Sequence, residues 1–199
     1  MAAVAFAVYL TTLAPGLTHE NYGADGGDLI AAARTLGVPH PPGYPTYTLL
    51  AWLFSHLPVG ILAYRVNLLS AVSAAIAVAL LYLTSQLLQP PDEHPVWIPA
   101  ATSLVFAFSP LLWSQAVITE VYALNSLFTM GLLWAALWWY RTRDPVALMA
   151  GSLLLGLGLS NHHVILLAAL AIAVWMLRLA PRLVLRWRLA LACFCLLYT

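Results

Sequence analysis

The chain has 199 residues, of which 63% are hydrophobic and 8% are charged, and it contains eight tryptophans. A soluble domain is excluded because the chain is too apolar, and a disordered chain is excluded because it is too rich in aromatic residues. All eight basic residues are arginines and the formal net charge is +1, so a nucleic-acid partner has no support. The composition predicts an all-α, polytopic membrane protein.

Apolar runs of about the 20 residues that span a bilayer recur along the chain. They cover about 1–17, 64–88, 96–113, 116–140, 145–160 and 163–180, with an incomplete run from 189 to the end. Because unpaired backbone groups are costly in lipid, each full run is predicted to be an α-helix. The first is interpreted as a transmembrane helix rather than a cleaved signal peptide, since no basic residue precedes it. A shorter run, about 45–57, predicts an interfacial or re-entrant helix.

The arginines predict how these helices are oriented. Six of the eight lie in two loops on one side of the predicted bundle, which the positive-inside rule makes cytoplasmic: Arg141, Arg143, Arg178, Arg182, Arg186 and Arg188. Asp92, Glu93, His94 and Asp144 fall on the same side. The opposite, extracytoplasmic side then collects His19, Glu20, Asp25, Asp28, His40, His56, Glu120, His162 and His163.

The two ends of the chain suggest a fragment. The last run, 189–199, has about half the length that a spanning helix needs, and the first has no cytoplasmic flank. We therefore expect residues 1–199 to be a single transmembrane module that is truncated at its C-terminus, with residues 18–63 as its first extracytoplasmic loop.

The longest polar interval lies in this first loop. Residues 28–37 predict a short helix, in which Asp28 either caps the N-terminus or has a functional role, and Gly37 ends the helix in the left-handed conformation. Asp25 lies before the helix, beside a Gly-Gly pair that lets the backbone approach a ligand closely. A solvated loop carboxylate is the alternative interpretation of Asp25.

The following segment is rigid, because it holds four prolines between residues 39 and 45. Gly43 and Tyr44 favour a turn, so the segment is predicted to fold into a pocket at the membrane interface and to place His40 there. The alternative is a rigid connector into the helix at 45–57.

Three other segments on the same side carry candidate partners. Arg65 and Asn67 begin the second span, where Arg65 is either an end residue that reaches toward water or a counter-charge to a phosphate. If a helix runs from Glu120, its 100° step puts Tyr122, Asn125 and Thr129 on one face and Glu120 on the opposite face.

The third segment is Asn161-His162-His163. Adjacent histidines point apart on a helix, so at most one is expected to face the pocket and a metal pair is not expected. Upstream, Ser152, Gly156 and Gly158 predict close helix packing.

Five segments resemble a known family: residues 25–33 (DGGDLIAAA), 36–45 (LGVPHPPGYP), 64–70, 119–125 and 158–163. Together they resemble the bacterial relatives of a eukaryotic protein O-mannosyltransferase, a family placed with the GT-C membrane glycosyltransferases. The resemblance implies the N-terminal part of a GT-C helix bundle that takes a sugar from a polyprenyl phosphate at the outer face. The acidic family motif maps onto residues 25–28, where Asp28 replaces the commoner glutamate.

The resulting hypothesis is sugar transfer with inversion to a hydroxyl of a protein or glycan acceptor, with mannose as the implied sugar. Asp25 is the candidate general base and Asp28 its catalytic partner, while Arg65 and one of His162 or His163 stabilise the leaving phosphate. The candidate substrate-binding residues are His40, Tyr44, Arg65, Asn67, Glu120, Tyr122, Asn125, Asn161, His162 and His163.

No cofactor or metal ligand is assigned, and a divalent cation at Asp25 and Asp28 is the alternative, although two carboxylates supply few of the oxygens that a hard cation needs. The expected location is the bilayer of a bacterial cytoplasmic membrane. Two other functions stay open at this point: a transporter or flippase of lipid-linked sugars, and a non-catalytic membrane fragment.

Overall fold

A computed structural model of the chain describes residues 1–90, 95–182 and 187–197, and these residues form helices and no strand. The helices are α1 (Ala2–Thr12), η1 (Glu20–Tyr22), α2 (Gly26–Thr35), α3 (Pro45–Ser55), α4 (Leu62–Leu88), α5 (Trp97–Ala107), α6 (Pro110–Ala116), α7 (Tyr122–Thr142), α8 (Pro145–Asn161), α9 (Ile165–Leu179) and α10 (Trp187–Leu197). The all-α prediction is therefore confirmed. Asp92, Glu93, His94 and Arg186, used above to orient the chain, lie outside the described residues.

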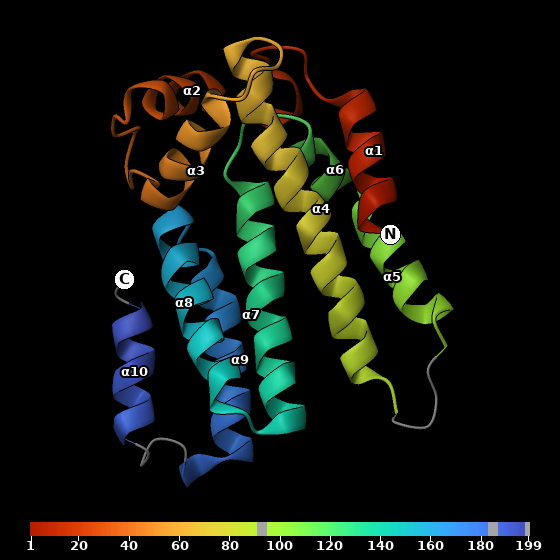
Figure 1. Cartoon of the computed structure of the whole chain (residues 1–199), viewed down its shortest axis with the longest axis vertical. Helices are drawn as coiled ribbons and strands as arrows, with labels where there is room; N and C mark the ends of the chain where they lie inside the picture. Colours follow the sequence, from red (N-terminus) through yellow and green to blue (C-terminus); the bar gives the residue numbers. More distant parts are fainter. Residues whose placement is uncertain (91–94, 183–186, 198–199) are drawn as a thin grey trace.

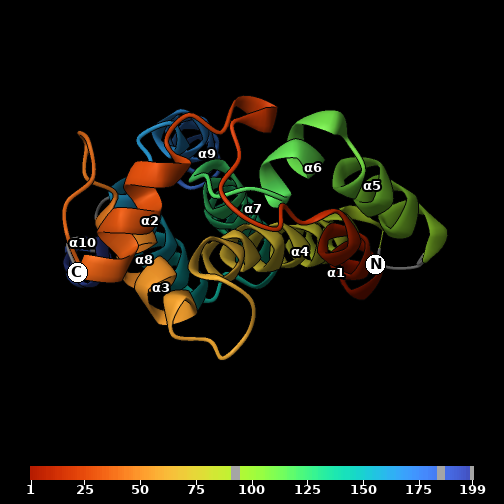
Figure 2. The ribbon, with the colours of Figure 1, turned by 90° about the horizontal axis from the view of Figure 1, so that it is seen from above.

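The long helix α4 organises the bundle. It packs against α7 along its length, and α7 in turn packs against α8 (Figure 1). Seen from above, α4 lies between α3 on one side and α1 on the other (Figure 2). The two short helices α2 and α3 pack together at one end of the bundle, above α8 in Figure 1.

Two apolar cores meet at α4. In the first, Tyr47 of α3, Leu124 of α7 and Ile165 of α9 pack with Val66 of α4. The second joins α1, α4 and the α6 region and includes Tyr9, Val78, Leu112 and Ile118. Burial of apolar area on both faces of α4 explains why a 27-residue helix carries little polar character over most of its length.

The run predicted as one span at 96–113 is broken into α5 and α6, which are bent by 63°. Ser109 and Pro110 cause the break, because Ser109 Oγ caps α6 by accepting from Leu112 N and Pro110 starts the new helix. The carbonyl of Ala107, at the end of α5, accepts a hydrogen bond from the buried Tyr9 hydroxyl at 2.7 Å. In the described part of the chain, α4 alone is long and apolar enough to cross a membrane by itself, and the bent pair would add a second span.

The structure differs from the sequence interpretation at three helix ends, where Asp28 as a cap was one of two alternatives and the face relation of Glu120 was conditional. Helix α2 begins at Gly26 with Asp25 at the N-cap, so Asp28 lies in the first turn and does not cap the helix. Leu36, with φ 51°, is the left-handed residue at its end, whereas the Gly37 amide donates to Ala32 O. Helix α7 begins at Tyr122, so Glu120 precedes it and the predicted face relation does not apply.

Other predictions are confirmed. The helix expected at 45–57 is α3, preceded by a turn in which Gly43 (φ 97°) and Tyr44 (φ 43°) are left-handed. Gly156 allows close packing, since a Cβ there would overlap the backbone of Leu197. One end of the bundle carries the loop after α1, the loop before α3 and the turn between α8 and α9. The C-terminal end of α7 lies at the opposite end (Figure 1).

Candidate functional site

The first element of the site is His40, which lies between two aspartates. The His40 main-chain N–H donates to Asp28 Oδ2 at 2.8 Å, and ring Nδ1 lies 2.9 Å from the same oxygen. Ring Nε2 lies 3.5 Å from Asp25 Oδ2 and 3.1 Å from the Tyr44 hydroxyl. The hydrogen bonds from His40, first the main-chain one, lower the pKa of Asp28 below its ordinary value. The site thus presents an ionised Asp28 and a half-exposed Asp25 on either side of one imidazole.

An aromatic cluster continues the site from Tyr44. The rings of Tyr44 and His162 are stacked at 6.3 Å, and the ring of Tyr122 lies 5.4 Å from that of His162. Burial, followed by the charge of Asp25, raises the pKa of Tyr44, so its hydroxyl stays protonated and can donate to His40. Burial and the neighbouring His163 lower the pKa of His162 and favour its neutral form. His163 itself is exposed, so one histidine of the pair joins the cluster.

Glu120 is the buried acid of the site. It lies in the loop before α7 and is 2% exposed. Burial raises its pKa above the ordinary value of a glutamate, and the nearby charge of Asp25 raises it further. Burial and the charge of Asp25 thus both disfavour the ionised form of Glu120.

Asn67 holds the loops that carry these carboxyls. It is 1% exposed, and its Nδ2 donates to Ala14 O at 2.9 Å and Gly16 O at 3.2 Å. Its Oδ1 accepts from Thr119 Oγ1 at 2.5 Å. The side-chain amide of Asn67 therefore joins the segment before Asp25 to the segment before Glu120. Both its nitrogen and its oxygen form hydrogen bonds with other residues of the protein.

Arg65 lies apart from this cluster. Its Nε donates to Val59 O at 2.7 Å, Nη1 to Ser55 O at 3.2 Å and Nη2 to Gly60 O at 2.9 Å. Ser55 is the last residue of the 11-residue helix α3, whereas Tyr44 precedes its first residue, and such a helix is about 16 Å long. The structure thus places Arg65 at the far end of α3 from Tyr44.

The two candidate amides also differ in position. Asn161 is buried at the end of α8, where its Nδ2 donates to Val121 O at 3.2 Å. Asn125, one turn into α7, lines a cavity of about 380 Å³ on the other side of Tyr122. Within the described residues, the side-chain oxygens of both amides are buried and have no hydrogen-bond partner. Substrate binding by these residues stays a prediction.

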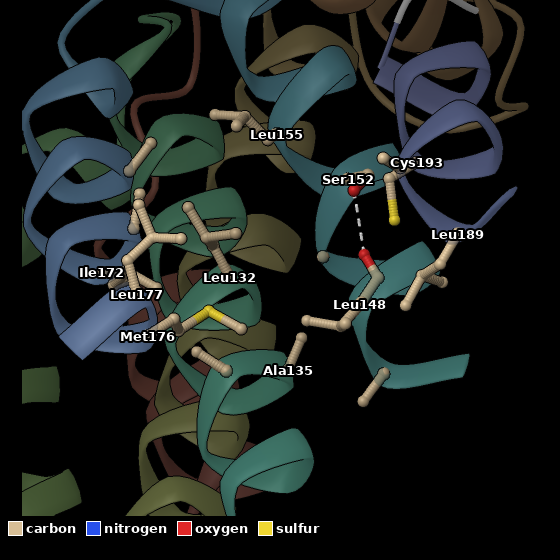
Figure 3. A pocket seen from close by; sticks show the side chains of 16 residues that line it. Leu132, Ala135, Leu148, Ser152, Leu155, Ile172, Met176, Leu177, Leu189 and Cys193 are labelled. Atoms are coloured by element: carbon tan, nitrogen blue, oxygen red, sulfur yellow. Dashed lines mark hydrogen bonds between the residues drawn. The ribbon is translucent and has the colours of Figure 1, made fainter. Parts of the chain in front are cut away.

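A cavity of about 320 Å³ between α7, α8, α9 and α10 has a different character (Figure 3). Side chains such as Leu132, Leu155 and Met176 line it, and the Ser152 hydroxyl donates to Leu148 O at 2.9 Å. No charged side chain of the described residues lines this cavity, and most of its walls are apolar. A further search of the described residues finds no group of three or more His, Cys, Asp and Glu side chains that could hold a metal ion.

The sequence was next compared with known proteins. The sequence model of the family described as "Protein O-mannosyl-transferase TMEM260 N-terminal domain" matches residues 25–184. The chain belongs to this family. The match begins at Asp25, and its range contains the residues of the site from Asp25 to His163.

Two curated relatives are similar over most of the chain. The mouse protein named "Protein O-mannosyl-transferase TMEM260" is 43% identical over 178 residues, which are 86% of this chain and 24% of the relative. The Dictyostelium discoideum protein of the same description is 30% identical over 192 residues, or 88% of this chain and 22% of the relative. The chain therefore spans about a quarter of the length of these relatives. No solved structure matches it significantly.

Sequence reasoning missed two residues near the site, Gln115 and Tyr22. Gln115 is 8% exposed, and its Nε2 donates to Asn21 O at 3.0 Å. An amide inside the apolar segment 110–118 is the signal that could have identified it. Tyr22 is 94% exposed and left-handed, with φ 64°, and no pattern in the sequence predicts this conformation.

Proposed function

We propose that the chain supplies the catalytic carboxylates of a membrane-embedded protein O-mannosyltransferase of the GT-C type. The enzyme takes mannose from a polyprenyl-phosphate donor and transfers it, with inversion, to a hydroxyl of a protein. Family membership supports the mannosyltransferase class. The observation that carries the proposal is the position of Asp25, a half-exposed carboxylate between the buried acid Glu120 and the ring of His40.

In the proposed step, the acceptor oxygen forms a bond to the anomeric carbon of mannose, and the bond from that carbon to the phosphate oxygen breaks. The electron pair of this bond leaves with the polyprenyl phosphate. Asp25 accepts the hydroxyl proton as general base, which typically contributes about 10²–10⁴-fold to the rate. His40 Nε2, 3.5 Å from Asp25, lies where it can share that proton.

Asp28 and Glu120 adjust this base. Asp28 holds Nδ1 of His40, so Nε2 faces Asp25 and Tyr44. Glu120 in its protonated form can donate a hydrogen bond to substrate or to a carboxylate, whereas its charged form would oppose the charge of Asp25. Asp28 and Glu120 are thus positioning residues in the proposal, and Asp25 is the catalytic residue.

The leaving phosphate needs positive charge or hydrogen-bond donors. Arg65 is engaged with three carbonyls at the far end of α3. In our proposal Tyr44 is therefore the nearer donor, and the His40 ring adds positive charge once Nε2 has taken up the proton from Asp25. Further groups are expected from the parts of the full-length protein that correspond to the rest of its relatives, of which this chain spans about a quarter.

We also propose that the protein crosses the membrane several times and that the Asp25 end faces the extracytoplasmic side. The arginine pattern supports this orientation, since Arg141 and Arg143 end α7 at the opposite end of the bundle (Figure 1). We keep a bacterial cytoplasmic membrane as the proposed location, although both curated relatives come from eukaryotes.

The test is a transfer assay on the full-length protein with a polyprenyl-phosphate mannose donor and a Ser/Thr-containing protein. We expect Asp25→Asn to lower kcat by about 10²–10⁴-fold. Asp144→Asn is the matched control, because Asp144 caps α8 at the far end and asparagine is an equally good cap. Near-normal turnover by Asp25→Asn would remove Asp25 from the base role.

The same assay separates transfer from transport. A flippase moves the lipid-linked sugar and leaves no mannose on protein, whereas a transferase gives a mannosylated product. The configuration of that product, opposite to that of the donor at the anomeric carbon, tests inversion.

A further inference from the structure

The cavity beyond Tyr122 is a site that the proposed chemistry does not use. Its volume is about 380 Å³, and residues of α5, α6 and α7 line it together with Tyr22 from the loop before α2. Tyr122 belongs both to this cavity and to the aromatic cluster with His162. The rings of Tyr122, His162 and Tyr44 therefore connect the cavity to His40, which contacts Asp25.

Two polar residues that line the cavity, Gln115 and Asn125, have buried side-chain oxygens without a hydrogen-bond partner in the described chain. Gln115 Nε2 donates to Asn21 O, which leaves Gln115 Oε1 as an acceptor; this oxygen and Asn125 Oδ1 are buried and lack a partner within the described chain. The hydroxyls of Ser109 and Ser126 donate to carbonyls of their own segments, Phe106 O and Tyr122 O. An unpaired buried carbonyl destabilises the protein, and a ligand that brings N–H groups can offset this cost.

The loop over the cavity is held in a costly conformation. Asn21 (φ 56°) and Tyr22 (φ 64°) are both left-handed, although neither is glycine. This conformation is unfavourable for residues with a side chain and persists where the surroundings hold it, as Gln115 holds Asn21 here. The result is a 94%-exposed Tyr22 ring at the cavity, three residues before Asp25.

Charge and shape decide between ligand classes. No charged side chain of the described residues lines the cavity, so a phosphate finds no counter-charge there. Its walls include Phe106, Leu112 and the two tyrosines, which suit apolar side chains. The two buried carbonyl oxygens match peptide N–H groups, which only donate, and the tyrosine hydroxyls can donate to peptide carbonyls.

We propose that this cavity binds an extended segment of the acceptor polypeptide and directs its Ser or Thr hydroxyl past Tyr122 toward Asp25. The inference rests on the proposed function, because it assigns the acceptor side of the same reaction. Asn125 and Gln115 are the binding residues for the peptide main chain, and Tyr22 covers the bound segment.

The first test is kinetic and uses the full-length protein. We expect Asn125→Leu to raise the KM for a Ser/Thr-containing peptide by about three- to tenfold, the loss of one such hydrogen bond. The KM for the donor and the slow hydrolysis of the donor by water stay unchanged. Ser126→Ala is the matched control, since its hydroxyl bonds within its own helix. An equal rise in both KM values would indicate a fold defect and overturn the assignment.

The second test does not depend on transfer. A photocrosslinking amino acid at Tyr22 is exposed to a labelled Ser/Thr-containing peptide, with unlabelled peptide, methyl mannoside or the polyprenyl-phosphate donor as competitors. Loss of crosslinking with unlabelled peptide alone supports the proposal. Competition by the mannoside or the donor, or no specific crosslink, overturns it. If the wild-type protein transfers no mannose but still crosslinks the peptide, the proposed function fails and the peptide site stands.

Discussion

A single oxygen of Asp28, Oδ2, accepts the main-chain N–H of His40 at 2.8 Å and lies 2.9 Å from its ring Nδ1. Because an ionised carboxylate only accepts hydrogen bonds, Nδ1 carries a proton, and in a neutral ring Nε2 is then an acceptor. The Tyr44 hydroxyl, 3.1 Å away, then donates to Nε2. This pair joins α2 to the proline-rich loop and fixes the ring that faces Asp25.

We expect this pair to stabilise the fold in a pH-dependent way. The pKa of Asp28 is lowered in the folded state, so its contribution is fully present above the unfolded value of about 3.9 and is lost as pH falls through the folded value. Asp28→Asn should therefore lower the Tm of the detergent-solubilised protein at pH 6, with a difference that shrinks below about pH 4. A Tm difference that grows on acidification would contradict this interpretation.

Glu120 predicts the opposite sign. Its raised folded pKa means that ionisation of the buried carboxyl costs stability as pH rises from the unfolded value of about 4.3 through the folded value. Glu120→Gln imitates the protonated acid, so we expect an equal or higher Tm at pH 8. A gain of about 1 kcal/mol in the free energy of unfolding corresponds to a rise in Tm of roughly 2–4 °C in a chain of this size. This gain should vanish at acid pH. Thermal melts of both proteins from pH 4 to 8 check this, and a lower Tm for the variant at every pH would refute it.

Composition and periodicity were sufficient for the helix class and for the grouping of the polar loops at one end. They failed where single side chains override the pattern. The apolar pattern of the run 96–113 gives no sign of a break. Ser109 and Pro110 nevertheless start a new helix, with a bend of 63°. The start of α2 at Gly26 is a second case in which one side chain overrides the pattern. Asp28 forms its hydrogen bonds with His40, 12 residues away, and does not cap its own helix.

For the candidate site, the sequence supplied the residue types but not the distances. The resemblance drew attention to Asp25, Asp28 and His40, and these three meet in the structure. Arg65 and Asn67 come from an equally suggestive segment, yet both donate to backbone carbonyls. Such tertiary hydrogen bonds are invisible to spacing rules, because the partner carbonyls exist at every residue.

The close approach at Gly23 gives a steric prediction. A Cβ at Gly23 would lie 2.8 Å from Thr18 O and 3.2 Å from Glu20 O, both backbone atoms that cannot rotate away. We expect Gly23→Ala to destabilise the protein by about 1–3 kcal/mol and to displace Tyr22 and Asp25. Gly27→Ala is the matched control, because its nearest neighbour would be Leu17 Cδ2 at 3.8 Å. Denaturation of the two variants side by side tests this, and equal stability would show that the loop moves freely.

Arg65 separates a structural role from a phosphate-binding role. Its three nitrogens donate to three different carbonyls around the end of α3, an arrangement that the single ammonium of lysine cannot reproduce. We therefore expect Arg65→Lys and Arg65→Gln to lose similar stability, about 1–2 kcal/mol, with little change in the KM for the donor. If Arg65 instead paired with the donor phosphate, lysine would retain much of the binding and glutamine would lose it. Measurements of Tm and of the KM for the donor in both variants distinguish the two roles. If Arg65 binds phosphate, the positive charge of lysine keeps the KM for the donor close to that of the wild type, whereas glutamine raises it.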